Sequence, residues 1–212
     1  MKSDVITITN LNKYYGSHQA VSNLNLSVHQ GEIFGFLGAN GAGKSTVIRC
    51  ILGLVSKTSG DIALLGGAYS SLTEALAHIG YLPSEAHFYP DMKVRDVIRL
   101  AAKARKIDCQ TEADRICEFL EVPLDKKIKD LSLGNRKKVS IVCALQHKPR
   151  LLLLDEPTSG LDPLMQERFF TLIKEVCLNG TTCFLSSHNL SEVTNYCDRA
   201  AIIKEGKLLV VD

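Results

Sequence analysis

The sequence GANGAGKST runs from Gly38 to Thr46, directly after the apolar segment Ile33–Leu37 and directly before a helical stretch, Thr46–Leu54. This pattern in a strand-loop-helix setting is typical of a phosphate-binding loop, or P-loop. Phosphate needs many donors and little steric bulk, and the glycines allow the backbone to curl with its N–H groups facing inward. The positive end of the following helix dipole adds to the attraction.

Three side chains of the loop have separate expected roles. Lys44 is placed to reach the β- and γ-phosphate oxygens, the Ser45 hydroxyl to ligate Mg²⁺, and Thr46 to donate near the α-phosphate. The other loop residues expected to line this site are Gly38, Asn40, Gly41, Ala42 and Gly43. The alternative is a glycine-rich turn with a chance Lys-Ser pair, which leaves the flanking strand and helix unexplained.

Two further apolar segments end in polar residues that suit phosphate chemistry. LLLLDE, Leu151 to Glu156, predicts a buried strand whose two terminal carboxylates point in opposite directions. Asp155 then suits direct or water-mediated help to Mg²⁺, and Glu156 suits a base or orienter for an attacking water. A strand merely capped by acids is the alternative. Such strand ends are where open α/β sheets bind ligands.

A second such segment, FLSSH, ends at His188. One histidine is often only a surface or helix-capping residue. Beside a P-loop and an acidic strand end on the same sheet edge, His188 is expected to contact the γ-phosphate.

The remaining pattern predicts an α/β fold with a P-loop core. Val5 to Thr9 and Leu24 to Val28 alternate apolar and polar residues, which favours an N-terminal antiparallel β region. Apolar runs alternating with helical stretches favour a mostly parallel sheet flanked by helices. Its expected strands are Ile33–Leu37, Ile79–Leu82, Leu151–Asp155, Thr182–Ser186 and Ala200–Lys204.

The expected domain organisation is a single domain, 1–212, with core 1–89 and 132–212 and an inserted helical lobe at about 90–131. Helical spacing of apolar residues replaces the strand pattern in that lobe. Glu205-Gly206 predicts a hairpin turn near the end. Because the sequence stops soon after it, at Asp212, a further C-terminal helix or domain is expected.

Composition excludes several function classes. The 212 residues carry 25 basic and 23 acidic side chains, a formal net charge of +2, so nothing favours binding to nucleic acid. The 7 cysteines include no C-x-x-C pair and are expected to be buried thiols in a reducing cytosol. Since no apolar run approaches the roughly 20 residues of a membrane helix, we expect a cytoplasmic chain that reaches a membrane only through a partner.

The motifs KYYG, GANGAGKST, GYLPSE, LSLGN, LLLLDEPTSGLD and SSH occur in that order along nearly the whole chain. Together they resemble the nucleotide-binding domain of an ATP-binding cassette (ABC) transporter, most closely the bacterial exporter type and a subgroup associated with multidrug or peptide-antibiotic export. The resemblance implies ATP and Mg²⁺ as ligands, ATP hydrolysis, transmembrane permease subunits as partners, and a second cassette. A homodimer is expected and a heterodimer is possible, on the inner face of the cell membrane.

The resemblance also assigns residues that pattern alone does not. Tyr15 in KYYG corresponds to the aromatic residue that stacks on adenine, ahead of its neighbour Tyr14; stacking tolerates other bases, so GTP stays open. Asp162 in SGLD matches a loop that crosses the dimer interface. Asp162-Pro163 also suits a helix N-cap followed by a first-turn proline.

The LSLGN segment matches the family signature, usually LSGGQ, which contacts the ATP bound to the opposite subunit. Ser132, Gly134 and Asn135 are the matching residues, and Ser132 is expected to cap a helix running from about Gly134 to Leu145. Leu133 departs from the pattern and is expected to turn toward the apolar residues of the helical lobe.

A second departure follows the strand Ile79–Leu82. The family usually has Gln, or sometimes Glu, at the position of Ser84, and this chain has Ser84 followed by Glu85. That residue joins Mg²⁺, water and the transmembrane coupling helix in the family. Either Ser84 or Glu85 is expected to take over the metal contact, with Glu85 favoured because Mg²⁺ prefers carboxylates.

A soluble ABC ATPase acting on ribosomes or DNA is the competing function. Such members usually carry two cassettes in one chain or split the cassette with long coiled coils, and this sequence has neither feature. Transport is therefore the preferred expectation.

Overall fold

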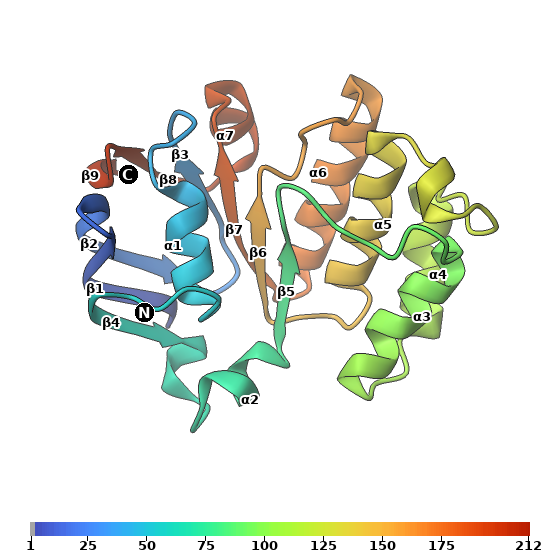
Figure 1. Ribbon diagram of the computed structural model, residues 1–212, viewed down its shortest axis with the longest axis horizontal. Coiled ribbons are helices and arrows are strands. Elements are labelled where there is room, and N and C mark those ends of the chain that lie inside the picture. The colour runs from blue at the N-terminus through green and yellow to red at the C-terminus, as the bar shows by residue number, and fades with distance from the viewer. Residues whose placement is uncertain (1–2) are drawn as a thin grey trace.

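The computed structural model describes residues 3–212 (Figure 1). Its strands are β1 (Asp4–Tyr15), β2 (His18–His29), β3 (Ile33–Leu37), β4 (Ser59–Leu64), β5 (Ile79–Leu82), β6 (Leu151–Asp155), β7 (Thr182–Ser187), β8 (Arg199–Lys204) and β9 (Lys207–Val211). Its α-helices are α1 (Lys44–Ile51), α2 (Leu72–Leu76), α3 (Val94–Arg105), α4 (Gln110–Phe119), α5 (Leu133–Leu145), α6 (Pro163–Leu178) and α7 (Leu190–Tyr196). Two short 3₁₀ turns, η1 (Leu65–Gly67) and η2 (Ile128–Asp130), complete the structure.

The strands form two sheets, as the sequence predicts. A six-stranded sheet has the order β5-β6-β7-β3-β8-β9, in which every neighbouring pair is parallel except β8 and β9. A three-stranded antiparallel sheet has the order β2-β1-β4. The predicted α/β class with an antiparallel N-terminal region is therefore confirmed.

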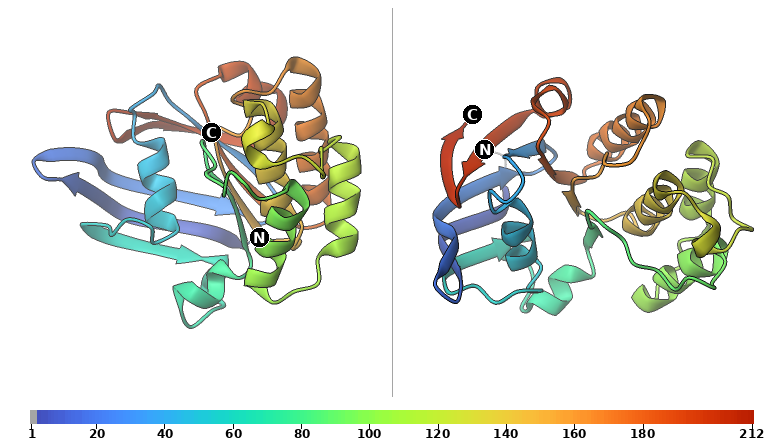
Figure 2. Two further views of the ribbon diagram at one scale, coloured as in Figure 1. Left: turned by 45° about the vertical axis from the view of Figure 1, so that its right-hand side comes forward. Right: turned by 45° about the horizontal axis from the view of Figure 1, so that its top comes forward.

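The six-stranded sheet separates two hydrophobic cores, and β6 contributes to both. Leu152 and Leu154 pack with the helices of one face, while Leu151 and Leu153 pack with α1 and the antiparallel sheet on the other. This alternation follows from the period of two in a strand. Figure 2 shows the antiparallel sheet at one end of the molecule and the helices α3, α4 and α5 at the other.

Several boundaries differ from expectation. The helix after the P-loop, α1, begins at Lys44 rather than Thr46 and ends at Ile51, because Gly53 with φ 67° closes it in a left-handed conformation. Neither β4 nor α2 was predicted. The predicted hairpin turn is present, since Glu205 and Gly206 both have positive φ, 48° and 75°, between β8 and β9.

The helices α3 and α4 occupy the segment where the sequence predicts a helical lobe. Among residues 3–212, the structure has no helix of the length and apolar character needed to span a membrane.

Candidate active site

The sheet order brings three predicted site segments to one edge. Strand β7 lies between β6 and β3, and all three are parallel, so their carboxyl ends meet. The P-loop leaves β3, the acidic pair ends β6, and the histidine segment ends β7. Polar residues distant in sequence therefore converge where ligands bind in open α/β sheets.

Two glycines of the P-loop lie so close to the backbone of neighbouring strands that no side chain would fit there. A Cβ at Gly38 would lie 2.6 Å from the Ile203 carbonyl oxygen. Gly43 has φ 109°, and a Cβ there would lie 2.7 Å from the carbonyl oxygen of Ala20 in β2. Larger residues would displace the loop from both sheets, so its shape depends on these positions.

Lys44 opens α1 and is 6% exposed. Its ammonium donates to the carbonyl oxygens of Gly38 at 2.6 Å and Ala39 at 3.1 Å. The same nitrogen lies 3.1 Å from Oε1 of Glu156. A buried ammonium needs such acceptors, and these three oxygens hold the lysine charge between the start of the P-loop and Glu156.

The Ser45 and Asp155 side chains are in direct contact. The Ser45 hydroxyl donates to Asp155 Oδ1 at 3.1 Å, and the Ser186 hydroxyl donates to the same oxygen at 2.7 Å. The second oxygen, Oδ2, is buried and has no hydrogen-bond partner within residues 3–212. A buried carboxylate oxygen without a donor is unfavourable unless another group satisfies it.

This pair of side chains fits Mg²⁺. The ion prefers hydroxyl and carboxylate oxygens and usually takes only one or two protein ligands, with water and substrate phosphates supplying the others. No group of three or more His, Cys, Asp or Glu side chains in the described chain could hold a metal by itself. The Ser45 hydroxyl and the Asp155 carboxylate are thus the two side chains here that suit a Mg²⁺ ion completed by water and a phosphate.

Glu156 corrects one expectation. It is not the last residue of the strand but follows β6 with φ 48°, so the alternating-direction argument does not apply to it. Its amide donates to the carbonyl and hydroxyl oxygens of Ser186, at 3.2 and 3.1 Å. This turn directs the Glu156 carboxylate to the same cluster as Asp155, where it meets Lys44.

His188 lies at the open side of this cluster. Its Nδ1 lies 2.7 Å from Oε2 of Glu156, and the imidazole side chain is 58% exposed while the carboxylate is 15% exposed. The histidine thus covers the carboxylate and presents its outer edge to solvent.

Sequence reasoning missed two buried charged residues of the site. Glu192 on α7 accepts hydrogen bonds from Thr158 Oγ1 and Ser187 Oγ, both at 2.7 Å, and so ties the segment after Glu156 to the segment before His188. Lys137 on α5 donates to the Glu156 carbonyl oxygen at 3.2 Å. Glu192 lies in a polar helix start and Lys137 in the run RKK, and both patterns are typical of solvated residues.

Comparison with known proteins agrees with this geometry. The model of the ABC transporter family matches residues 21–159, which include the P-loop, the signature segment and the acidic strand end. The chain belongs to the ABC transporter family of ATP-binding domains. A shorter match, over residues 125–194, is to a family described as an AAA domain. Members of the ABC family are ATPases coupled to transport, and their ATP-binding subunits pair with transmembrane permease components.

Among related sequences, the bacitracin transport ATP-binding protein BcrA of Bacillus licheniformis is 41% identical over 98% of this chain and 69% of its own length. The linearmycin resistance ATP-binding protein LnrL of Bacillus subtilis is 36% identical over 95% of this chain and 67% of its own. A solved ATP-binding subunit of an ABC transporter superposes with a TM-score of 0.88 and 28% identity, covering 98% of this chain and 89% of that one. The resemblance drawn from the motifs is confirmed.

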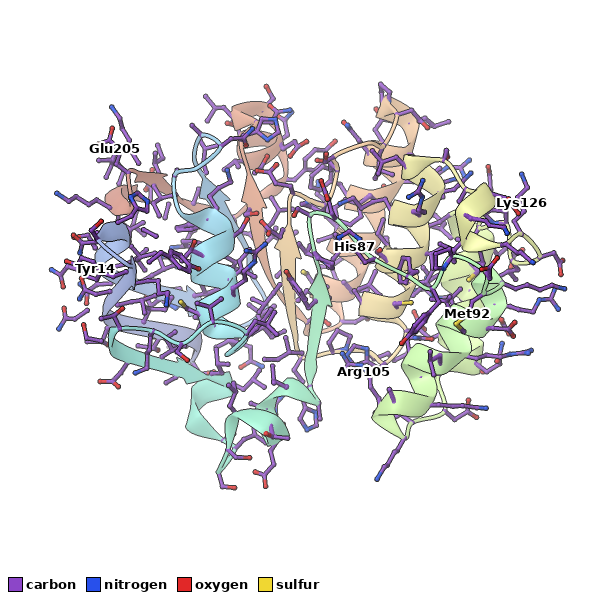
Figure 3. The ribbon with its side chains drawn as sticks, in the orientation of Figure 1. Tyr14, His87, Met92, Arg105, Lys126 and Glu205 are labelled. Carbon is purple, nitrogen blue, oxygen red and sulfur yellow. The ribbon has the colours of Figure 1, made fainter. Side chains whose placement is uncertain are left out.

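The adenine and coupling residues assigned by resemblance lie on the surface of this ABC domain. Tyr15 ends β1, is 45% exposed, and has the Lys13 ammonium 4.7 Å from its ring centre. The hairpin that holds it reaches the P-loop, because Ala20 of β2 lies against Gly43. Figure 3 labels the adjacent Tyr14 at the outer margin of this hairpin.

Ser84 and Glu85 follow β5. Glu85 is exposed, and the carbonyl oxygen of Ser84 accepts a hydrogen bond from Lys137 at 2.7 Å. A role for either side chain at a metal stays a prediction.

The signature segment lies against a loop of the same chain. Ser132 caps α5 by accepting from the Asn135 amide at 3.3 Å, as expected. Leu133 does not turn into the helical lobe: it is 58% exposed, and its Cδ2 would lie 2.8 Å from a Cβ at Gly160. This leucine therefore covers the face of a glycine in the TSGLD loop.

Asp162, at the end of that loop, caps α6 by accepting from the Met165 amide at 2.9 Å, with Pro163 in the first turn. This is the helix start that the Asp-Pro pair predicts.

Proposed function

We propose that this chain is the ATP-hydrolysing subunit of an ABC exporter. Two copies enclose two Mg·ATP, and each nucleotide is bound between the P-loop of one copy and the signature of the other. Closure of the two copies around the nucleotides drives a conformational change in separate transmembrane permease subunits. The observation that carries the proposal is the Glu156 carboxylate, which is shared between Lys44 on one oxygen and His188 on the other.

The site residues have distinct roles in this reaction. Lys44 and the loop amides bind the β- and γ-phosphates, and Glu156 orients the attacking water and receives its proton. His188 holds Glu156 through Nδ1 and contacts the γ-phosphate through Nε2. Ser45 and Asp155 would hold Mg²⁺, which neutralises developing charge on the phosphate oxygens when bound.

The opposite side of each nucleotide is assigned to Ser132, Gly134 and Asn135 of the second copy, with Asp162 at the interface and Tyr15 against the base. A homodimer is the simplest arrangement, because one chain carries both the P-loop and the signature. The chain would then act on the inner face of the membrane, held there by its permease partner.

The cargo class follows from relatives rather than from the site. BcrA and LnrL are named for bacitracin transport and linearmycin resistance, which supports export of an antibiotic-like compound. The permease forms the cargo path, so its identity decides the substrate. A soluble ABC ATPase is the remaining alternative, and stimulation of ATPase activity by a permease would exclude it.

The direct test is phosphate release from ATP by the purified chain, with Mg²⁺ and with Mg²⁺ chelated. We expect Mg²⁺-dependent turnover that Lys44→Ala abolishes, because the P-loop loses its mobile charge. Lys103→Ala, which removes an exposed lysine of α3, is the matched control and should keep wild-type turnover. Equal turnover in the Lys44→Ala and wild-type proteins would overturn the assignment.

A further inference from the structure

Lys137 is a buried cation in the helix that begins with the signature. It is 5% exposed. Its ammonium donates to the carbonyl oxygens of Ser84 at 2.7 Å, Glu156 at 3.2 Å and, at a longer 3.5 Å, Pro83. Three donors therefore meet three backbone acceptors from two different segments.

The helix itself buries this position. Lys137, Ser140, Ile141 and Ala144 are all buried and recur at the spacing of one helix face. An ammonium on such a face is costly unless its donors are satisfied. The acceptors come from outside the helix. A buried lysine is therefore tolerated here because the loop after β5 and the end of β6 both approach α5.

The two segments joined by Lys137 have different roles in the proposed mechanism. By the resemblance to the family, Ser84 belongs to the loop expected to couple nucleotide to permease, and Glu156 is the proposed base. Figure 3 labels His87 on the same loop as it passes from β5 toward the helices, in front of α5.

Glu156 also depends on backbone contacts for its direction. A positive φ is unfavourable for a residue with a side chain, and such conformations persist where their surroundings hold them. Ser186 accepts from the Glu156 amide, and Lys137 donates to the Glu156 carbonyl oxygen. The peptide groups on both sides of Glu156 are thereby fixed.

We propose that Lys137 is a positioning residue for hydrolysis, which links the loop after β5 to the backbone of Glu156. Movement of the loop is passed to the carboxylate through the Ser84 carbonyl, Lys137 and the Glu156 carbonyl. The link uses the main chain of Ser84, so it does not need the Gln side chain that the family usually has there. The inference rests on the proposed function for the role of Glu156.

The test compares Lys137→Met, which keeps length and removes the donors, with Lys137→Gln, whose amide can still donate two hydrogen bonds. Lys138→Met is the matched control, since Lys138 is the next residue of α5 and only half-buried. In the full chain we expect Lys137→Met to lower kcat about tenfold or more and to leave KM for Mg·ATP within about twofold, because the phosphate donors are untouched. Lys137→Gln should recover part of kcat, and Lys138→Met should resemble the wild type.

Amide hydrogen exchange without nucleotide measures the link independently of catalysis. Exchange should rise together in residues 84–88 and 156–160 of Lys137→Met and stay unchanged in Lys138→Met. Unchanged exchange in Lys137→Met, or a kcat within about twofold of wild type, overturns the inference; if Lys137→Met does not fold, the same criteria apply to Lys137→Leu, which also removes the donors. If the wild-type chain has no ATPase activity, the proposed function is refuted. The hydrogen-exchange comparison then tests by itself whether Lys137 links the two segments.

Discussion

The Nδ1 atom of His188 lies 2.7 Å from a carboxylate oxygen of Glu156. The imidazole holds one carboxylate oxygen while the Lys44 ammonium lies 3.1 Å from the other, so the carboxylate is fixed in direction from both sides. Glu156→Gln should preserve ATP binding and lower kcat by on the order of a hundredfold or more, because the base is lost while the phosphate donors stay. Gel filtration with Mg·ATP should show an accumulated dimer. Only monomer, together with near-normal turnover, would contradict both the role and the two-copy mechanism.

The same contact predicts non-additivity between the two residues. Because His188 acts in part through Glu156, His188→Ala should lower the single-turnover rate strongly in the wild type and less in Glu156→Gln, where only its γ-phosphate contact remains to be lost. The double-mutant cycle is measured from single-turnover rates at saturating Mg·ATP. Independent, multiplicative effects would assign the two residues separate functions.

The signature segment predicts graded effects at three neighbouring positions. Leu133→Gly should change the saturated ATPase rate only a few-fold, and Ser132→Ala should lower it clearly because the cap of α5 is lost. Gly134→Asp should nearly abolish activity, since a Cβ there would lie 2.9 Å from the Gly160 carbonyl oxygen and the new charge would face the γ-phosphate. If Leu133→Gly instead activates a silent protein by orders of magnitude, a different partner cassette must supply the second site.

A buried histidine away from the active site predicts a pH dependence of stability. His147 Nε2 lies 3.3 Å from the Ile79 carbonyl oxygen, and burial, aided by the charge of Arg105, lowers the pKa of His147 to about 4. In the unfolded chain its pKa is near 6.5, so below that pH the unfolded state binds a proton that the folded state does not. Keeping His147 neutral therefore costs no stability above pH 6.5, and the free energy of unfolding falls as the pH drops from 6.5 toward 4.

Between pH 7 and pH 5 this linkage should lower the free energy of unfolding by about 2 kcal/mol. Urea denaturation at the two pH values should show that loss in the wild type and in His18→Gln, which changes an exposed histidine. His147→Gln should show a smaller difference between the two pH values. An equal difference in all three proteins would mean that His147 titrates normally.

Two strands of the six-stranded sheet were predictable from sequence because their buried residues form short continuous apolar runs. Leu151–Asp155 and Ile79–Leu82 match the observed strands residue for residue. The strand β4, Ser59–Leu64, has mostly exposed or half-buried residues and a glycine, so no apolar pattern marks it. Where a strand depends on its neighbours rather than its own residues, sequence periodicity is a weak guide.

Some residues of the candidate site could likewise be predicted from sequence and others could not. Lys44, Ser45 and Asp155 were predictable because local spacing fixes their places at a loop and a strand end. Lys137 was not, because its burial depends on two segments distant in sequence approaching α5. The direction of Glu156 was missed because a positive φ interrupts the strand period at that residue.

The contact of Leu133 with Gly160 has a consequence for how the two nucleotides of the proposed dimer act together. Leu133 adjoins the residues assigned to the partner's ATP, and Gly160, which it contacts, lies two residues before Asp162, which is proposed to lie at the dimer interface. In the proposed dimer, binding of one nucleotide would shift the loop beside the other, and we expect ATP turnover to be cooperative, with a Hill coefficient above one. Leu133→Gly should bring that coefficient toward one even where the maximal rate changes little, which separates communication between the sites from catalysis within each.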